Sequence, residues 1–195
     1  LPAPLLNAIE FIFSEFSDGS CLVGGTALAG FYAGHRRSDD IDLFTKDEFA
    51  QSATIRVVLS LVGIGAELSN KRESRQHFHC LATLKSHKFI VDVVLDPHFH
   101  LIPSAQTKVG KISVATLEGI LAMKMATLVS RCSEKDLYDL LWLFNNFKRP
   151  QFSDFVSLGR MIDMGVSEES ILISLSSVQP RESACHFAEQ VGVSA

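Results

Sequence analysis

The sequence has no long hydrophobic run, and its N-terminal segment lacks the pattern of a signal peptide. No uninterrupted apolar segment approaches the roughly 18 residues that a membrane-spanning helix needs. The N-terminal segment LPAPLLNAIEFIF has no basic region before its apolar residues and carries Glu10 among them, which is typical of an amphipathic helix. We therefore expect a soluble, cytoplasmic protein that makes no membrane contact.

Cysteines are few, and negative charges outnumber positive ones. The four cysteines form no Cys-x-x-Cys pair and lie far apart in a chain too long to need disulfides: Cys21, Cys80, Cys132 and Cys185. This distribution predicts reduced thiols, as in a cytoplasm. The formal net charge of -4 excludes nucleic-acid binding through overall positive charge, so any contact with nucleic acid must be local.

The composition that remains is that of a globular protein. With 195 residues, of which 47% are hydrophobic and 21% are charged, the chain can bury a sizeable core as one domain or as two small ones. No internal repeat, low-complexity tract or long linker is visible in the sequence. A composition change near Gly110 predicts a boundary between two domains, 1–110 and 111–195.

The periodicity of apolar residues predicts an α/β unit followed by helices. Helical spacing indicates helices at 5–16, 26–32 and 47–61, and alternation indicates a strand at 40–44. Further strand candidates are 21–23, 66–69, 77–84 and 88–95. Four further helical patterns occupy 117–129, 135–147, 153–162 and 168–175. This order favours an α/β (α+β) core with an appended C-terminal helical bundle.

Three aspartates lie in the predicted strands. Because strand side chains alternate, Asp40 and Asp42 should share one face about 7 Å apart, while Ile41 and Leu43 point to the other. A carboxylate pair in a cleft is costly unless a divalent cation neutralises it. Asp92 lies in the apolar pattern FIVDVVLD. If its strand lies beside that of the pair, the three acids could hold Mg²⁺ in the two-metal arrangement of phosphoryl transfer.

Gly24 and Gly25 precede the short helical pattern in which Thr26 can act as the cap. A backbone without side chains can approach a phosphate, and the start of a helix offers free N–H groups and a positive dipole. The three residues are therefore a candidate phosphate-binding turn, although most Gly-Gly pairs are only turns.

The segment GGTALAGFYAGHRRSDDIDLF resembles the opening motif of the nucleotidyltransferase superfamily, and more closely that of its AbiEii/AbiGii toxin branch. The matched positions are Gly24, Gly25, Thr26, His35, Arg36, Ser38, Asp40 and Asp42. KMATLVSRCSEKDLYDL is similar to the later motif of this branch, and its matched positions are Lys124, Arg131, Lys135, Asp136 and Asp139. The resemblance extends from about Leu22 to Phe147.

The resemblance implies a nucleotidyltransferase-like mixed sheet flanked by helices. It also implies transfer of a nucleoside monophosphate from an NTP to a nucleic acid or another hydroxyl acceptor, with Mg²⁺ or Mn²⁺ as cofactor. The 3′ end of tRNA is one candidate acceptor, and a cognate antitoxin is a candidate partner.

The resemblance also implies roles for individual residues. Asp40 and Asp42 would bind the metal, and Asp92 would complete the metal site or act as a base. Lys124 would neutralise phosphate charge in the transition state, and Asp136 would orient it or contact substrate. The implied nucleotide-binding residues are Gly24, Gly25, Thr26, Arg36, Ser38 and Arg131.

Some of these charged residues have structural alternatives. Asp136 could cap a helix together with Ser133, and Lys124 could extend along its apolar helix to solvent. Asp139 could pair with Arg131 across the helix connection. Asp39 should be a solvated loop acid, because its side opposes that of Asp40, and Arg36 or Arg37 could pair with it.

Two other clusters and two other functions stay open. A zinc site would draw on His77, His79, Cys80, His98 and His100, but their spacing fits no standard finger, which favours plain strand surface. The basic cluster Lys71, Arg72 and Arg75 on a predicted hairpin could guide an RNA acceptor. The alternative functions are a catalytically idle nucleotide- or RNA-binding module that acts through a partner protein, and an aminoglycoside-modifying enzyme.

Overall fold

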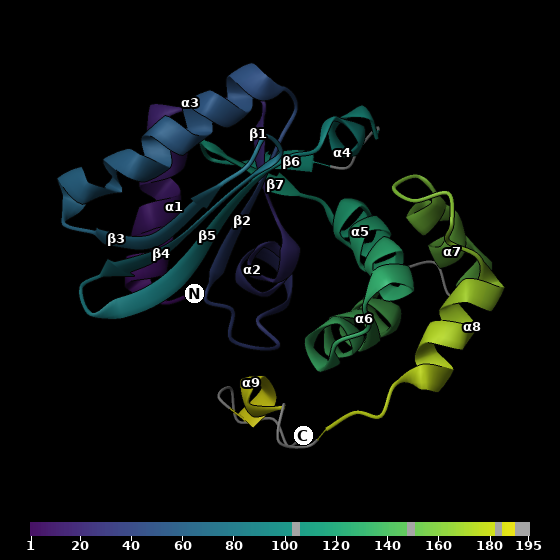
Figure 1. Ribbon diagram of the computed structural model, residues 1–195. Coiled ribbons are helices and arrows are strands. Elements are labelled where there is room, and N and C mark those ends of the chain that lie inside the picture. Colours follow the sequence, from purple (N-terminus) through teal and green to yellow (C-terminus); the bar gives the residue numbers. More distant parts are fainter. Residues whose placement is uncertain (103–105, 148–150, 182–184, 190–195) are drawn as a thin grey trace.

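The computed structural model describes residues 1–102, 106–147, 151–181 and 185–189. Within these residues, a mixed seven-stranded sheet has the order β3-β4-β5-β2-β1-β7-β6 (Figure 1). The strands are β1 (Ser20–Val23), β2 (Asp40–Thr45), β3 (Glu67–Glu73), β4 (His77–Leu84), β5 (His87–Leu95), β6 (Gln106–Val109) and β7 (Ile112–Ala115). β1 runs parallel to β7 and β2 runs parallel to β5, while the other neighbours are antiparallel. The predicted mixed sheet is confirmed.

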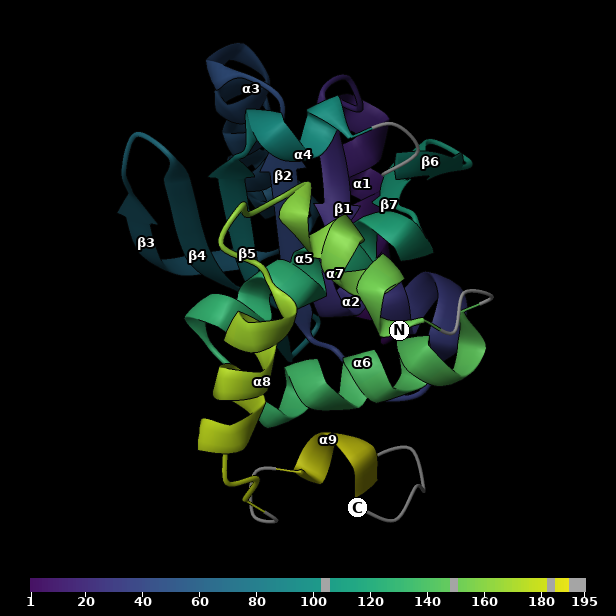
Figure 2. The ribbon, with the colours of Figure 1, turned by 90° about the vertical axis from the view of Figure 1, so that its right-hand side faces the viewer.

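Helices cover both faces of the sheet. α1 (Ala3–Glu15) and α3 (Glu48–Leu59) lie on one side, and the C-terminal helices lie on the other (Figures 1 and 2). The C-terminal helices are α5 (Leu117–Ser130), α6 (Glu134–Asn146), α7 (Phe152–Arg160), α8 (Glu168–Ser177) and α9 (His186–Glu189). No helix in the described part of the chain is both long and apolar enough to cross a bilayer. The predicted C-terminal helical region is confirmed.

The alternation of β2 separates a core face from a polar face. Ile41 and Leu43 are fully buried, whereas Asp40 and Asp42 are partly exposed. The buried side chains join a core that includes Ile12 of α1. Because strand side chains alternate, burial of one set directs the acids to the other face.

A hairpin that the sequence pattern did not predict completes the sheet. β6 and β7 pair around Gly110, whose φ of +61° suits the turn, and β7 also pairs with β1 through Leu22 and Val114. Gly110 therefore lies inside a hairpin of the sheet. The two-domain division stays a prediction, and we propose that the change from sheet to helices falls between β7 and α5.

The helix after β1 starts earlier than expected. α2 (Gly24–Leu28) begins at Gly24 with a φ of +71° and continues as a π-helical turn, Ala29–Ala33, which Gly34 ends as predicted. Val23 occupies the N-cap position, so the prediction that Thr26 caps the helix is wrong. The reason is that Gly24 tolerates the left-handed conformation, which allows the helix to start two residues before Thr26.

Candidate active site

Asp40, Asp42 and Asp92 gather on the polar face of the sheet. β2 and β5 are parallel neighbours, and Asp42 is the register partner of Asp92. Register partners on adjacent strands lie about 4.8 Å apart and point to the same face. The condition that the sequence analysis set for the three acids to meet, that the strand of Asp92 lies beside that of Asp40 and Asp42, is therefore met.

The three carboxylates repel one another in a partly desolvated setting. Burial raises the pKa of Asp42 from 3.8 to about 7, and the charges of Asp40 and Asp92 add to the shift. Burial also raises the pKa of Asp40, although the charge of Lys135 opposes that shift. The arrangement therefore has an excess of negative charge that a bound cation would relieve.

The two glycines let charged side chains lie directly against the backbone. A Cβ on Gly24 would collide with Oδ2 of Asp42, and a Cβ on Gly25 would collide with Nη2 of Arg36. Next to them, the Thr26 hydroxyl lies 2.9 Å from Oγ of Ser38. The turn is thereby fitted against both the acids and the loop that leads into β2.

A buried ion network anchors the basic side of the site. Arg36 donates from Nε and Nη2 to the two carboxylate oxygens of Asp139, at 2.6 and 2.8 Å. Lys124 places Nζ 2.7 Å from Asp139 Oδ2 and 2.7 Å from Asp136 Oδ1. His35 adds a contact of 2.8 Å from Nε2 to Asp139 Oδ1. The network joins the loop before β2 to α5 and α6.

Both acids of this network are ionised at neutral pH. Burial alone would raise the pKa of Asp139, but hydrogen bonds from Arg36 and His35 and the charge of Lys124 hold it well below its usual range. Burial would likewise raise the pKa of Asp136, but the charge and hydrogen bond of Lys124 lower it. The two carboxylates are therefore counter-ions for the buried cations.

Contacts around α6 decide between the sequence alternatives. Ser133 is the N-cap: the backbone N–H of Asp136 donates to its Oγ at 3.3 Å, and its hydroxyl donates to Asp136 Oδ2 at 2.6 Å. The cap is confirmed at Ser133, but the Asp136 carboxylate meets the Ser133 hydroxyl and not, as in a capping box, the backbone N–H of Ser133. Arg131 places Nε 3.7 Å from Asp136, so the proposed pair with Asp139 is wrong. Asp139 is enclosed by Arg36 and Lys124, whereas the Arg131 side chain is 74% exposed.

The loop before β2 resolves a further alternative. Arg37 is the arginine that pairs with Asp39, at 3.0 Å from Nε to Oδ2, and both side chains are exposed. Asp39 also lies 3.1 Å from Nε2 of His87. As expected, Asp39 is a surface acid outside the carboxylate group.

Acidic and basic side chains of the site line one pocket of about 260 Å³. Its lining consists of Gly25, Arg36, Ser38, Asp40, Asp42, Lys124, Arg131, Ser133, Lys135 and Asp136. Three sequence candidates, Asp92, Gly24 and Thr26, lie next to this lining and not within it. Sequence analysis gave no role to Lys135, although its place directly before Asp136 in the matched motif was a usable signal.

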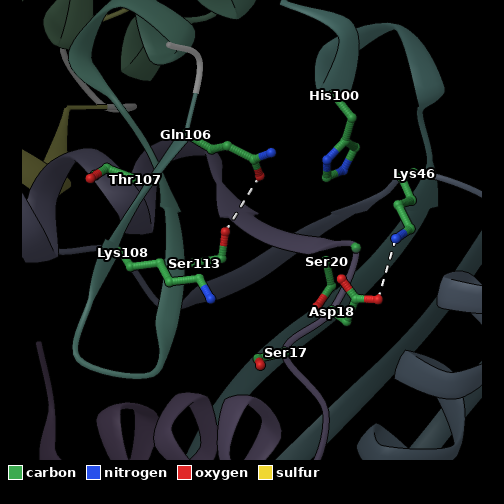
Figure 3. A pocket seen from close by; sticks show the side chains of 10 residues that line it. Ser17, Asp18, Ser20, Lys46, His100, Gln106, Thr107, Lys108 and Ser113 are labelled. Atoms are coloured by element: carbon green, nitrogen blue, oxygen red, sulfur yellow. Dashed lines mark hydrogen bonds and ion pairs between the residues drawn. The ribbon is translucent and has the colours of Figure 1, made fainter. Parts of the chain in front are cut away.

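A larger pocket, of about 450 Å³, lies at the opposite end of β1 (Figure 3). Ser20 at that end pairs with Thr45, whereas Val23 at the other end pairs with Asp42. The pocket contains Lys46, but its ammonium group lies 3.3 Å from Asp18. Its lining includes His100 of the zinc alternative but none of the residues that the motif resemblance implies, so the pocket beside the carboxylates is the candidate active site.

Two histidines of β4 reach Asp92. His77 Nε2 lies 2.6 Å and His79 Nδ1 lies 2.9 Å from Asp92 Oδ1. Cys80 points to the buried face, and the other two histidines of the zinc alternative, His98 and His100, belong to α4 (Pro97–Leu101). The five residues considered for zinc therefore do not form one cluster, and only His77 and His79 lie together, beside Asp92.

Comparison with known proteins identifies the family. The model of a nucleotidyl transferase family, the AbiEii toxin of type IV toxin–antitoxin systems, matches residues 5–162. The chain belongs to the AbiEii nucleotidyltransferase toxin family. The match includes every candidate site residue of this AbiEii protein. Curated protein sequences give no match.

Solved structures share the fold of this AbiEii protein at low sequence identity. A Helicobacter pylori protein assigned as a nucleotidyltransferase is 17% identical, with a TM-score of 0.60 over 98% of this chain and 95% of that chain. JHP933, also from Helicobacter pylori, is 15% identical, with a TM-score of 0.58 over 96% and 89%. The nucleotidyltransferase toxin MenT4 from Mycobacterium tuberculosis is 18% identical, with a TM-score of 0.60 over 90% and 72%. These similarities establish a nucleotidyltransferase fold.

Proposed function

We propose that this protein transfers a nucleoside monophosphate from an NTP to a hydroxyl group of an RNA, for which the 3′ end of tRNA is a candidate. The observation that supports this most is the pocket in which Asp40 and Asp42 face Lys124 and Arg131. The acids suit a divalent cation, and the cations suit a triphosphate. A metal–nucleotide complex would therefore neutralise both walls of the pocket.

The carboxylates fit a Mg²⁺ or Mn²⁺ ion. Asp40 and Asp42 would hold the ion through oxygen ligands, and Asp92 would supply a third carboxylate or accept the proton of the acceptor hydroxyl. Burial, together with the charges of Asp40 and Asp92, raises the pKa of Asp42 to about 7, and a bound cation would favour its ionised form. When bound, the ion would supply charge stabilisation at the phosphoryl oxygens.

Residues on the other wall would hold the triphosphate. The ammonium group of Lys124 has three N–H donors, and its contacts with Asp136 and Asp139 use two of them. The third donor is left for a phosphate oxygen, where it would offset charge that develops in the transition state. Arg131 would add a second positive charge from the rim of the pocket.

The turn at Gly24 and Gly25 would bind phosphate oxygens next to the metal. Gly25 brings bare backbone to the pocket, Gly24 lies against Asp42 next to it, and Ser38, which contacts Thr26, adds a hydroxyl. Arg36 would act from a fixed position, because Asp139 accepts two of its hydrogen bonds. This turn would set the orientation of the α-phosphate relative to the carboxylates.

The proposed reaction is an in-line displacement. The acceptor oxygen attacks the α-phosphorus, the bond to the bridging oxygen of the β-phosphate breaks, and pyrophosphate leaves. The hydroxyl proton passes to a carboxylate of the site. The basic residues Lys71, Arg72 and Arg75 are exposed on the β3–β4 hairpin and would guide RNA toward the acids. Arg72 is the register partner of His79, and His79 is the register partner of Asp92, so these three residues lie in line across the same face of the sheet.

Family membership also supports a partner. The family is that of a toxin in type IV toxin–antitoxin systems, and we propose that this chain is the toxin of such a pair in the cytoplasm. Its cognate antitoxin would then oppose the effect of the transfer reaction on the cell. Co-expression with the neighbouring gene product should restore growth that expression of the chain alone inhibits.

Labelled nucleotides test the proposed reaction. The protein is incubated with Mg²⁺, total cellular RNA and each α-labelled NTP in turn, beside Asp40→Ala, Asp42→Ala and the control Asp39→Ala, an exposed acid paired with Arg37. We expect label on RNA from the natural protein and the control only, which also identifies the donor NTP. Transfer by both Asp40→Ala and Asp42→Ala would contradict the metal site. Nucleotide binding without transfer to RNA would contradict the proposed reaction and favour an idle binding module.

A further inference from the structure

His77, His79 and Asp92 form a compact group of potential metal ligands outside the pocket lining. One ligand atom from each residue lies within 4.8 Å of the other two. Both imidazoles approach the same oxygen, Asp92 Oδ1, at 2.6 Å from His77 and 2.9 Å from His79. Two ring nitrogens thus converge on one carboxylate oxygen.

The sheet register explains this convergence. His79 on β4 is the register partner of Asp92 on β5, and Asp92 is in turn the partner of Asp42 on β2. Register partners share a face, and His77 lies two residues before His79 and so joins that face. Asp92 therefore stands between the histidine pair and the carboxylates of the candidate active site.

We propose that His77, His79 and Asp92 bind a divalent transition-metal ion such as Zn²⁺, at a site distinct from that of Mg²⁺. Two imidazole nitrogens with one carboxylate oxygen are ligands typical of zinc and its neighbours, whereas Mg²⁺ prefers oxygen alone. Three protein ligands leave a coordination position for water or another ligand. The side chains of His77, His79 and Asp92 are 48%, 28% and 23% exposed, so an ion can reach them from solvent.

The geometry needs only a small adjustment to admit an ion. Ligand atoms placed tetrahedrally at about 2.0–2.1 Å from zinc lie roughly 3.3 Å from one another. The present separations of 2.6 and 2.9 Å are those of hydrogen bonds, so both imidazoles must retreat from Asp92 by less than about 1 Å. The side chain of His77 is half-exposed, so this adjustment can be made at the side chain.

The shared carboxylate would couple the two metal sites, a consequence that rests on the proposed function. A dication held at Oδ1 of Asp92 would repel a second dication at Asp42, the neighbour of Asp92 across the strand pair. We expect Zn²⁺ to raise the Mg²⁺ concentration needed for half-maximal transfer by the natural protein, with no such shift in His77→Asn. An equal shift in both proteins would overturn the coupling.

Metal binding alone tests the site without any transfer assay. The full chain, with excess Mg²⁺ present to occupy the carboxylates, is titrated with Co²⁺ by visible absorption and with Zn²⁺ against a chromophoric chelator. His77→Asn, His79→Asn and Asp92→Asn are compared with Asp40→Asn, an acid of the adjacent site. His98→Asn serves as the histidine control, since His98 is an exposed residue of α4.

We expect a single tight Co²⁺ site with the absorption of a nitrogen-ligated ion. The three ligand variants should each weaken Zn²⁺ binding by at least roughly tenfold. Loss of a residue that only hydrogen-bonds to a metal ligand already lowers metal affinity by about 10–100-fold, and loss of the ligand itself should cost no less. His98→Asn should bind as the natural protein does, and Asp40→Asn, which weakens the neighbouring Mg²⁺ site, should bind Zn²⁺ no less tightly. Unchanged affinity in both His77→Asn and His79→Asn would overturn the proposal, whether or not the protein transfers nucleotides.

Discussion

Replacement of Asp42 by asparagine should stabilise the metal-free protein while it abolishes transfer. The carboxylate lies in a partly desolvated position beside Asp40 and Asp92, which is unfavourable for the ionised form. An amide of nearly the same shape keeps the packing and removes the charge. It also removes a proposed metal ligand, so stability and activity should change in opposite directions.

The pKa of Asp42 sets the size and the pH range of this effect. A rise from 3.8 to about 7, which is about 3 pKa units, corresponds to about 4 kcal/mol at most. Because structural relaxation and water reduce such penalties, we expect a gain of about 2 kcal/mol, or about 4–8 °C in Tm. Above about pH 7 Asp42 is ionised in both folded and unfolded states, and the gain is complete. It declines as the folded state takes up the proton and vanishes below about pH 4, where both states are protonated.

Thermal unfolding in EDTA at pH 8 and at about pH 4.5 checks this prediction. The matched control is Asp39→Asn, three residues away, whose side chain is 37% exposed and pairs with Arg37. Asp42→Asn should melt above the natural protein at pH 8 and close to it at the lower pH, while the control should gain nothing at either. An unchanged or lower Tm of Asp42→Asn at pH 8, or a gain of equal size at both pH values, would refute the electrostatic argument.

Three further substitutions probe the basic wall. Gly25→Ala should lower transfer strongly, because the new Cβ would displace Arg36. The control Gly63→Ala, whose new Cβ has no atom within 4 Å, should leave transfer unchanged, and steady-state kinetics of the two variants checks this. Asp139→Asn should cost about 3–5 kcal/mol of unfolding free energy at neutral pH, since it leaves buried Arg36 and Lys124 without their shared counter-ion. Because the pKa of Asp139 is lowered, its stabilising contribution is complete above the ordinary 3.8 and is lost as the pH falls below it, so urea unfolding in acid should show a shrinking difference. Lys124→Gln should reduce kcat by roughly 10²–10³-fold with a smaller change in NTP affinity, and an unchanged kcat would exclude its proposed role.

Local patterns were sufficient to predict the strands that carry the acids. β4 was predicted with its observed bounds, and β2 and β5 each within one residue, because polar and apolar side chains alternate along β2, whereas β4 and β5 are short, mostly apolar runs. The pairing of β2 with β5 was stated only as a condition for the acids to meet, since sequence pattern does not specify strand order. The hairpin of β6 and β7 was missed because four exposed residues, followed by a two-residue turn and four buried ones, form no helical or alternating pattern.

Partner choice within the site depended on the tertiary structure. Asp139 was a matched motif position, but its partners Arg36 and His35 are 103 and 104 residues away in the sequence. Nothing local distinguishes them from Arg131, which lies closer along the chain. The histidines beside Asp92 were likewise noticed as a cluster, but which of them meet an acid follows from the register of β4 with β5.

The most direct test of the central claim is which phosphate of the NTP reaches the RNA. The protein is incubated with Mg²⁺, RNA and one NTP, labelled in one reaction at the α-phosphate and in a parallel reaction at the γ-phosphate. The proposed site predicts that RNA acquires the α label only, that pyrophosphate forms in equal amount, and that Asp42→Asn does neither. Transfer of the γ label, or an α label that Asp42→Asn transfers at an equal rate, would contradict nucleotidyl transfer at these carboxylates.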